Sequence, residues 1–422
     1  MRTRLLPDLV REALGGLVQH RFRVGLSLLG IAWGIIAVVT LLSYGTGFGR
    51  ALDAGFRGAF SDGVAVAFPG QTSRQSGGER AGRQVRITPA DVLDLSELPL
   101  VRRVSPEYMH DVTVSWGNTH TTYMVRGVAS SYGPMRSERP EPGGRFIDDE
   151  DVRLRRRVAF VGAEVRRKLF GNRPAIGETL RLGGVPFEVI GVGLEKVQMA
   201  NYNRPDKYCV FVPWTAMDSL TDTQYVDDFV MQAVSPAEEQ RALLAVRAFL
   251  ADRYRFDPSD ERALNSFGSA QTQEMTGGIV IGLRLVLAFI GVLTLGIGAV
   301  GIMNVMFVSV QERTREIGLR KALGARRREI LLQFLFEGMF TTVVGGAIGI
   351  AASFGLVRLL SPQPFLAELL DDASRVTDIH LVLSPGLVLL SASILMAVGF
   401  VAGLLPAIKA SRLDPIESLR YE

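Results

Sequence analysis

Four long apolar segments constrain the fold of this chain more than any other feature of its sequence. They cover residues 24–48, 285–311, 338–357 and 381–408. None of these segments contains a charged side chain. A helix rises about 1.5 Å per residue, so about 20 residues cross a hydrocarbon core of about 30 Å. The segments therefore predict four transmembrane helices rather than the buried core of a large soluble protein.

These segments divide the chain into membrane-spanning and water-exposed parts. We predict transmembrane helices at residues 22–45, 279–311, 330–358 and 381–408. The other parts are a cytoplasmic amphipathic helix at 1–21, an extracytoplasmic domain at 46–278, a cytoplasmic loop at 312–329, a short outer loop at 359–380 and a cytoplasmic tail at 409–422. The first segment is too long for a cleaved signal peptide and lacks a small-residue cleavage site after it, so we expect a signal anchor.

Arginine and lysine residues next to the segments predict the orientation, because short cytoplasmic loops of membrane proteins carry an excess of them. The flank before the first segment, the loop at 312–329 and the tail at 409–422 are rich in these residues. Around the outer loop there are only Arg358 and Arg375, together with several acidic residues. We therefore expect both termini to face the cytoplasm and residues 46–278 to lie outside.

The composition excludes several functional classes. The chain has 42 arginines but five lysines and no G-x-x-x-x-G-K-[ST] phosphate loop, so it is not a P-loop ATPase by itself. A single cysteine, Cys209, excludes an intramolecular disulfide and a cysteine-built metal site. The acidic run at 148–151 does not match a calcium loop, which favours a solvated turn. We find no catalytic constellation, and we predict no catalytic site, no bound cofactor or metal and no nucleic-acid partner.

The region between the first two segments has the pattern of a mixed α/β domain. Thr88 followed by Pro89 predicts the start of one helix. Ser235 and Glu238 have the spacing of a capping box, which predicts a second helix at 236–254. Gly183-Gly184 predicts a hairpin turn, and the polar stretch 71–84 a mobile loop. Strands are predicted at residues 121–128, 158–161, 187–192, 208–212 and 229–234.

Small residues at a spacing of three or four recur in the apolar segments, and such residues let helices approach closely in lipid. They are Gly30, Gly34, Gly298, Gly301, Gly345, Gly349, Gly399 and Gly403. Packing within one chain and a seam between two copies both remain open. We predict that Asn304, the main polar residue of the second segment, forms an interhelical hydrogen bond. Glu337 is expected to pair with the basic cluster 326–328 or with the ends of the spans.

One stretch of the chain indicates what kind of protein this is more specifically than the composition does. Residues 298–325 read GAVGIMNVMFVSVQERTREIGLRKALGA, and the chain ends in GFVAGLLPAIKASRLDPIESLRYE. Together with the sequences GGRFIDDED, VAFVGAEVRRKLF and GVPFEVIGVG, in that order, this closely resembles the MacB/FtsX-type ABC transporter permeases (the type VII exporter fold). On composition alone, the stretch after residue 311 is a solvated helix end. The family commonly has two adjacent glycines where this chain has Gly298-Ala299.

The resemblance implies a fold and a mechanism. It implies four transmembrane helices and a large α/β extracytoplasmic domain with a part inserted at about 111–221, in a bacterial inner membrane. It implies a stand-alone permease that needs a separate ABC ATPase carrying ATP and magnesium, a second permease copy or paralogue, and a periplasmic adaptor. The second span would be a stalk that transmits motion, a mechanism called mechanotransmission. The coupling helix that docks on the ATPase would include Arg313, Arg315, Glu316, Ile317, Arg320, Lys321, Leu323 and Gly324.

Several functions remain open on this basis. The leading hypothesis is export of amphiphilic or peptide cargo, a form of efflux, with no catalytic site in this chain. The alternatives with the same fold are lipoprotein release and FtsX-like signalling to a cell-wall hydrolase or a sensor. A secondary transporter is disfavoured because the chain lacks inverted repeats and discontinuous helices. A membrane-anchored hydrolase is disfavoured because no nucleophile or metal cluster stands out.

Overall fold

The computed structural model describes residues 21–58, 60–199, 201–367, 375 and 377–419. These residues fall into two compact units. The helical unit is formed by the described residues of Met1–Arg50, Gly278–Pro364 and Asp378–Glu422, and the α/β unit by those of Ala51–Gly277 and Phe365–Thr377. The amphipathic helix predicted at 1–21 lies outside the described residues except for Arg21.

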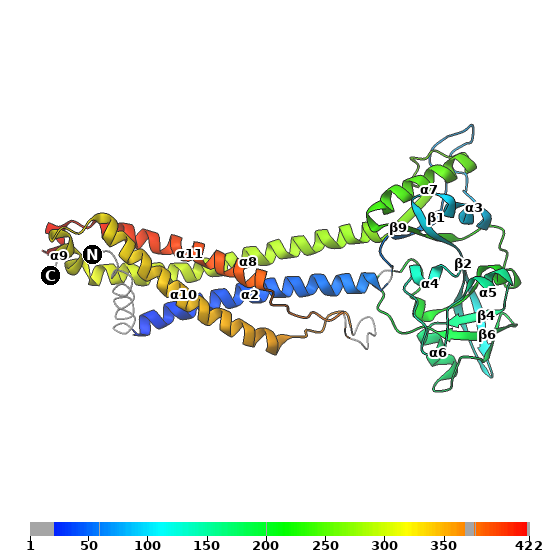
Figure 1. Cartoon of the computed structure of the whole chain (residues 1–422), viewed down its shortest axis with the longest axis horizontal. Helices are drawn as coiled ribbons and strands as arrows, with labels where there is room; N and C mark the ends of the chain where they lie inside the picture. Colours follow the sequence, from blue (N-terminus) through cyan, green and yellow to red (C-terminus); the bar gives the residue numbers. More distant parts are fainter. Residues whose placement is uncertain (1–20, 59, 200, 368–374, 376, 420–422) are drawn as a thin grey trace. The chain divides into compact units, whose positions relative to one another are not determined.

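Four long helices dominate the described part of the helical unit (Figure 1), and each is long and apolar enough to cross a membrane. They are α2 (Arg21–Arg57), α8 (Ser269–Glu312), α10 (Arg327–Leu360) and α11 (Pro385–Arg412). The four predicted spanning helices are therefore confirmed. Both α2 and α8 are longer than the predicted spans and include residues of the α/β unit. Helix α11 starts at Pro385 because the Ser384 side chain caps it, accepting a hydrogen bond from the Leu387 backbone.

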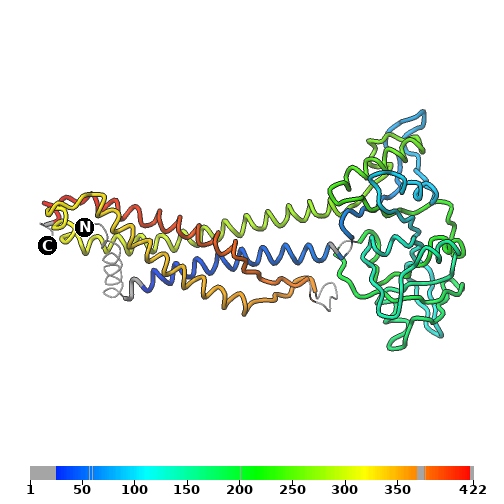
Figure 2. Tube along the Cα trace, viewed as in Figure 1, coloured from blue at the N-terminus to red at the C-terminus, as the bar shows by residue number. Residues whose placement is uncertain are grey.

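Two short helices complete the described helical unit. Helix α9 (Thr314–Ala322) lies between α8 and α10, and α12 (Pro415–Leu419) follows α11. Helices α10 and α11 pack along each other (Figure 2), and α12 packs against α9. The segment between α8 and α10 is therefore an ordered helix and not an extended loop.

The described residues of the α/β unit contain nine strands in one sheet. The order β2-β3-β7-β4-β6-β5 returns to β2, so these strands close into a barrel. The order β2-β8-β1-β9 continues the sheet from the other half of β2, with antiparallel pairing throughout. The strands are β1 (Val64–Pro69), β2 (Val101–Trp116), β3 (Thr119–Val128), β4 (Val158–Val161), β5 (Thr179–Leu182), β6 (Val185–Val192), β7 (Cys209–Pro213), β8 (Asp228–Ala233) and β9 (Leu264–Gly268).

Strand β2 joins the two halves of this sheet. Its first half, from Val101 to Glu107, pairs with β8, and its second half, from Glu107 to Trp116, pairs with β3. The five predicted strands are present with ends that differ by at most two residues, and both glycines of the predicted Gly183-Gly184 turn have positive φ. The sequence patterns did not predict β1, β2, β5 and β9. A proline within a sequence segment argues against a strand, so Pro106 hid β2 from prediction by sequence pattern.

Helices cover this sheet at several places. They are α3 (Pro89–Asp94), α4 (Tyr132–Met135), α5 (Asp149–Arg153), α6 (Ala163–Phe170) and α7 (Glu239–Tyr254), with short 3-10 turns at Leu95–Glu97, Asp206–Tyr208, Trp214–Ser219 and Pro236–Glu238. The predicted cap of α3 is confirmed, because the Thr88 hydroxyl accepts a hydrogen bond from the Asp91 backbone.

The capping box predicted for α7 is wrong. Ser235 makes no capping hydrogen bond with its side chain, and the segment begins as a 3-10 turn at Pro236–Glu238. The Glu238 carboxylate, which would complete the box, lies 3.2 Å from Arg241 Nη1 instead. An ion pair one turn further along the chain has replaced the local cap.

The stretch 71–84, predicted as a mobile loop, folds as an irregular hairpin. Gln71 and Gln84 form a β-bridge at its base. The Asp260 carboxylate accepts hydrogen bonds from the Ser73 hydroxyl at 2.7 Å and the Arg74 backbone at 3.1 Å. These contacts tie the hairpin to the turn that precedes β9.

Candidate functional site

Helix α9 is a separate short helix because the chain bends at Arg313, whose backbone is not helical. The Thr314 hydroxyl donates to the Gln311 carbonyl at 2.8 Å, at the end of α8. At the other end Gly324 has a φ of +100°, and its amide donates to the Lys321 carbonyl at 3.1 Å. A left-handed residue just after the last turn is a common helix end, and glycine adopts it without strain. Gly324, directly after the C-cap Leu323, therefore ends α9.

One face of α9 is anchored inside the helical unit. Ile317 is buried in the same apolar cluster as residues of α8, α10 and α11. Gly318 lies against α12, where an added Cβ atom would be 2.6 Å from the Ser418 Cβ. The Lys321 ammonium donates to the carbonyls of Ser411, at 3.0 Å, and of Leu413, at the end of α11. Burial lowers the pKa of Lys321, and the nearby Arg327 charge lowers it further.

An ion pair and a side-chain hydrogen bond join this segment to α10, and a second ion pair lies within α9. Arg313 Nη1 lies 3.2 Å from Glu337 Oε2. Arg320 Nη1 lies 2.8 Å from Gln333 Oε1, and its Nη2 lies 2.7 Å from Glu316 Oε1. Glu337 thus pairs with Arg313, at the end of the second span, which is one of the two predicted arrangements.

The opposite face of α9 is open to solvent, and we call it the α9 outer face. It consists of Arg315, Glu316, Leu319 and Leu323, and the exposed fractions of the two leucines are 52% and 81%. Exposed large apolar side chains flanked by charges are typical of a surface that binds another protein. Leu319 was missed in the sequence analysis, although its spacing of four from both Arg315 and Leu323 could have indicated it.

The structure divides the predicted coupling residues into two groups. Arg315, Glu316, Leu323 and Gly324 are exposed. The remaining ones are engaged within the chain and hold the helix in place: Arg313, Ile317, Arg320 and Lys321.

The small residues predicted for helix packing lie mostly at contacts within the chain. An added Cβ atom at Gly298 of α8 would be 3.1 Å from the Gly30 carbonyl oxygen of α2. An added Cβ atom at Gly345 of α10 would be 3.0 Å from the Ile31 Cβ of α2. Gly34, Gly349, Gly399 and Gly403 likewise face Leu295, Ile35, Thr342 and Leu335.

Two predicted packing residues of α8 behave differently. Nothing lies within 4 Å of an added Cβ atom at Gly301. Asn304 is exposed, and its amide makes no hydrogen bond to any residue that the structure describes. The interhelical hydrogen bond predicted for Asn304 therefore does not form between the described helices of one copy.

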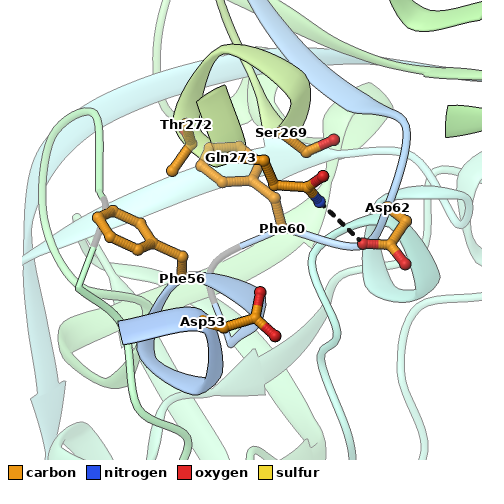
Figure 3. Close-up of a pocket in the computed structure, with 7 residues that line it drawn as sticks. All are labelled: Asp53, Phe56, Phe60, Asp62, Ser269, Thr272 and Gln273. Atoms are coloured by element: carbon orange, nitrogen blue, oxygen red, sulfur yellow. Dashed lines mark hydrogen bonds between the residues drawn. The ribbon is translucent and has the colours of Figure 1, made fainter. Parts of the chain in front are cut away.

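A small pocket lies in the α/β unit between the end of α2 and the start of α8 (Figure 3). Its volume of about 20 Å³ is room for one water molecule. Gln273 Nε2 donates across it to Asp62 Oδ1 at 3.4 Å. Its lining residues are Asp53, Phe56, Phe60, Asp62, Ser269, Thr272 and Gln273. A pocket this small is no site for a drug-sized ligand, which needs about 300 Å³ or more.

A buried ionic cluster in the α/β unit was missed by sequence analysis. Arg126 of β3 is fully buried, and its Nη1 lies 3.2 Å from Glu107 Oε1 of β2. The same atom donates to the Tyr132 hydroxyl of α4 at 2.8 Å, and Nη2 donates to the Arg204 carbonyl at 2.9 Å. Arg126 interrupts an apolar strand sequence, and that interruption is the signal that could have indicated the cluster.

Asp206 is the second centre of this cluster. Its carboxylate lies 3.2 Å from Arg136 Nη2 and 2.8 Å from Lys196 Nζ. Burial by itself would raise the pKa of Asp206, but the charges of Arg136, Lys196 and Arg126 hold it well below its usual range. Asp206 is therefore ionised in the folded protein at neutral pH.

Two further acids border the cluster. Burial raises the pKa of Glu138 to about 7, with the Lys196 charge opposing the effect. Burial and the neighbouring Glu107 carboxylate raise the pKa of Asp228 well above its usual range. The ion pair between Arg126 and Glu107 joins β3 to β2, and the hydrogen bond from Arg126 to Tyr132 joins β3 to α4.

Among the described residues no group of histidine, cysteine or acidic side chains has the geometry to hold a metal ion. The acidic run at 148–151 is the start of α5, where Asp148 and Asp151 form a capping box. The carboxylate of Asp151 is buried and paired with Arg145. Cys209 is a buried free thiol, and burial raises its pKa to about 12, which makes it a poor nucleophile.

Comparisons with known proteins match nearly the whole chain. The family model of the MacB-like periplasmic core domain matches residues 24–249, and that of the FtsX-like permease C-terminal region matches residues 288–415. A "Macrolide export ATP-binding/permease protein MacB" of Bdellovibrio bacteriovorus is 36% identical over 408 residues, which are 96% of this chain and 60% of that protein. A protein of the same name from Burkholderia cenocepacia is 35% identical over 411 residues, 97% of this chain and 57% of that protein.

The chain thus spans about 60% of the length of these relatives. Among solved structures, the periplasmic region of MacB from Actinobacillus actinomycetemcomitans has a TM-score of 0.42 at 16% identity, covering 53% of this chain and 94% of that one.

Proposed function

Because the chain belongs to the family of MacB/FtsX-type permeases with a MacB-like periplasmic core domain, we propose that it is the permease subunit of an ABC transporter driven by a separate ATPase. The relatives are named as joint ATP-binding and permease proteins. These 422 residues contain no phosphate loop, so ATP and magnesium would bind outside them, on the ATPase.

The observation that carries this proposal is the α9 outer face. Leu319 and Leu323 are exposed on a helix whose other face is anchored by Ile317 and Lys321. An exposed apolar pair on a rigidly held helix binds a partner at a low entropic cost, because little has to be ordered on binding. We infer that the ATPase docks here, on the cytoplasmic side indicated by the excess of arginine and lysine.

Motion of α9 would reach the α/β unit through α8. Helix α8 is continuous from Ser269, which belongs to the α/β unit, to Glu312, one residue before the bend at Arg313. ATP-driven movement of the docked ATPase would thus be transmitted along one helix to the extracytoplasmic side. There the α/β unit, with a second permease copy and an adaptor, would move amphiphilic or peptide cargo.

The test is affinity purification of the tagged full chain from its native membrane in mild detergent, followed by mass spectrometry. We expect an ABC ATPase in about equal amount. In the double variant Leu319→Ser/Leu323→Ser, we expect at least about ten-fold less ATPase, because two interface anchors are lost.

A matched double variant controls for the loss of two exposed leucines. Leu154 is 52% exposed in the α/β unit, and Leu359 is 81% exposed at the end of α10. The double variant Leu154→Ser/Leu359→Ser should recover as much ATPase as the original chain. If the Leu319→Ser/Leu323→Ser chain recovers as much ATPase as the original chain, the α9 outer face is not the docking surface. Recovery of a cell-wall hydrolase or a sensor without any ATPase would reject the transporter proposal in favour of signalling.

A further inference from the structure

Helix α8 begins at a position that has no side chain to cap it. Its first residue is Ser269, directly after β9, whose last residue is Gly268. The first backbone N–H groups of a helix have no acceptor within the helix, and the side chain just before the helix commonly supplies one. Because Gly268 has no side chain, an acceptor for this turn has to come from another part of the fold.

Glu239, the first residue of α7, supplies that acceptor. Its buried carboxylate accepts hydrogen bonds from the Ala270 backbone N–H at 3.0 Å and from the Ser269 hydroxyl at 2.5 Å. The Ser269 hydroxyl oxygen in turn accepts a hydrogen bond at 2.9 Å from the backbone N–H of Gly63, the residue before β1. A carboxylate at the N-terminal end of a helix also interacts favourably with the helix dipole. We call this set of contacts the Glu239 clamp.

Gly268 leaves room for the Glu239 carboxylate. An added Cβ atom at Gly268 would overlap Glu239 Oε1, and it would lie 3.2 Å from the Ala65 Cβ of β1. Glycine in a strand often marks such a close approach of another group. The junction between β9 and α8 is therefore shaped around an acid that lies 30 residues before Ser269 in the sequence.

The clamp connects α8 to the sheet through α7. Helix α7 packs against β1, β8 and β9 (Figure 1), and its residues Ala242, Val246 and Leu250 are buried in the same apolar cluster as residues of these strands. A spacing of four places these three side chains on one face of the helix. Strand β9, from which α8 continues, lies at the end of the described sheet, beside β1. Without the clamp, the first turn of α8 would lose the hydrogen bonds that tie it to α7, and a helix end with fewer contacts opens more easily.

We propose that Glu239 is a positioning residue that makes α7, β1 and the first turn of α8 move as one body. Movement of α8 then reaches the sheet and is not absorbed by bending next to Gly268. This inference rests on the proposed function, in which α8 transmits movement between α9 and the α/β unit. The clamp adds to that function the residue through which the movement enters the sheet.

Hydrogen exchange of the full chain in nanodiscs tests whether Glu239 holds the first turn of α8. In Glu239→Ala, the Ala270 amide should exchange at least about ten-fold faster, the factor expected for the loss of one hydrogen bond to a charged group. Glu239→Gln keeps one acceptor oxygen, so its exchange rate should fall between those of Glu239→Ala and the original chain. Unchanged exchange in Glu239→Ala would overturn the clamp.

Two further variants make this experiment specific. Glu238→Ala is the matched control, because Glu238 pairs with Arg241 at 3.2 Å, and exchange at Ala270 should not change. Ser269→Ala removes one donor and leaves the carboxylate in place, so it carries the test if Glu239→Ala does not fold. It should also speed exchange at Ala270, and an unchanged rate in a folded Ser269→Ala chain would count against the clamp.

Spin labels on α7 and α8 test whether the clamp passes movement on. Ala248 of α7 and Glu274 of α8 are exposed and Cys209 is buried, so Ala248→Cys/Glu274→Cys accepts labels in the otherwise unchanged chain. With the co-purified ATPase, we expect the same distance between the labels without nucleotide and after trapping with ATP and vanadate, because the two helices move together. In the additional presence of Glu239→Ala the distance should change on trapping. A purely structural role would alter the distance equally in both states.

The two experiments separate this inference from the proposed function. A preparation without an ABC ATPase would reject the proposed function and with it the transmission of movement, while exchange at Ala270 would still show whether Glu239 holds the turn. If the ATPase is bound and the Glu239→Ala chain shows the same distance in both nucleotide states, only the coupling role of Glu239 is rejected. Faster exchange together with a nucleotide-dependent distance in Glu239→Ala supports both.

Discussion

The helical unit and the α/β unit are packed with different chemistry. In the helical unit, glycines such as Gly298 and Gly345 let backbones approach until an added methyl group would meet Gly30 or Ile31. In the α/β unit, the residues at the centre include two fully buried arginines, Arg126 and Arg136, with their acidic partners. One interior depends on steric fit and the other on paired charges embedded among apolar side chains.

The difference follows from the surroundings of each unit. Lipid tails are as apolar as leucine, so helices in a membrane gain little from apolar burial and associate through close contact. In water, burial of the apolar strands of the barrel stabilises the fold by about 25 cal/mol per Å². That gain can offset the desolvation of paired charges, which then make the arrangement of strands specific. The following predictions test this contrast.

The largest effect is expected from Arg126→Met. Removal of this guanidinium leaves the buried carboxylates of Glu107 and Asp206 with less compensating charge. Breaking a buried ion pair in this way costs about 3–5 kcal/mol. The measurement is the unfolding of the full chain in nanodiscs, followed by the fluorescence of Trp116 and Trp214 in the α/β unit.

Its control is Arg155→Met. Arg155 pairs with Asp218 at 3.1 Å, but its side chain is 70% exposed. Arg155→Met should therefore lower the free energy of unfolding by only about 0–1 kcal/mol. Equal destabilisation by the two variants would contradict the view that buried charge pairs organise this unit.

A smaller effect is expected from Gly349→Ala in the helical unit. A methyl group here would collide with Ile35 and come within 2.9 Å of the Ala32 carbonyl oxygen. Overpacking of this kind costs about 1–3 kcal/mol. The melting temperature of the purified chain in detergent should fall. Gly355→Ala in the same helix meets nothing within 4 Å, and we expect it to melt like the original chain. A comparable decrease in melting temperature for Gly349→Ala and Gly355→Ala would show that steric fit at Gly349 does not explain the destabilisation.

The smallest effect concerns pH. Burial raises the pKa of Glu138 to about 7, so the folded protein binds a proton there that the unfolded chain, with a pKa near 4.5, releases. The stability that this proton supplies is fully present below pH 4.5 and is lost as the pH rises towards 7. Glu138→Gln removes this titration, so the variant should lose about 1 kcal/mol less stability than the original chain between pH 6 and pH 8.

The same unfolding experiment at a series of pH values measures the effect. Glu79→Gln, at an exposed glutamate of the hairpin 71–84, is the control and should leave the pH profile unchanged. A profile that is equally steep in the Glu138→Gln chain would show that another group titrates in this range.

The sequence predicted those features that depend on local pattern. Four apolar segments of membrane-spanning length predicted α2, α8, α10 and α11, because the length of a span is set by the thickness of the bilayer. The cap at Thr88 and the turn at Gly183-Gly184 were also correct, since both depend on neighbouring residues alone. The resemblance of residues 298–325 indicated the family that the comparisons then showed.

Only the tertiary structure decided which residue faces which. The closure of β2 through β5 into a barrel joins strands distant in sequence, and β2 itself was hidden by its polar residues and Pro106. Ile317 and Lys321 of α9 turned out to be anchors, while Leu319 is exposed. The burial and pairing of a side chain depend on contacts between segments that are distant in the sequence, so a local sequence pattern cannot predict them. For that reason the sequence determined the class of the chain and predicts its membrane topology, and the packing alone determined which surfaces remain exposed.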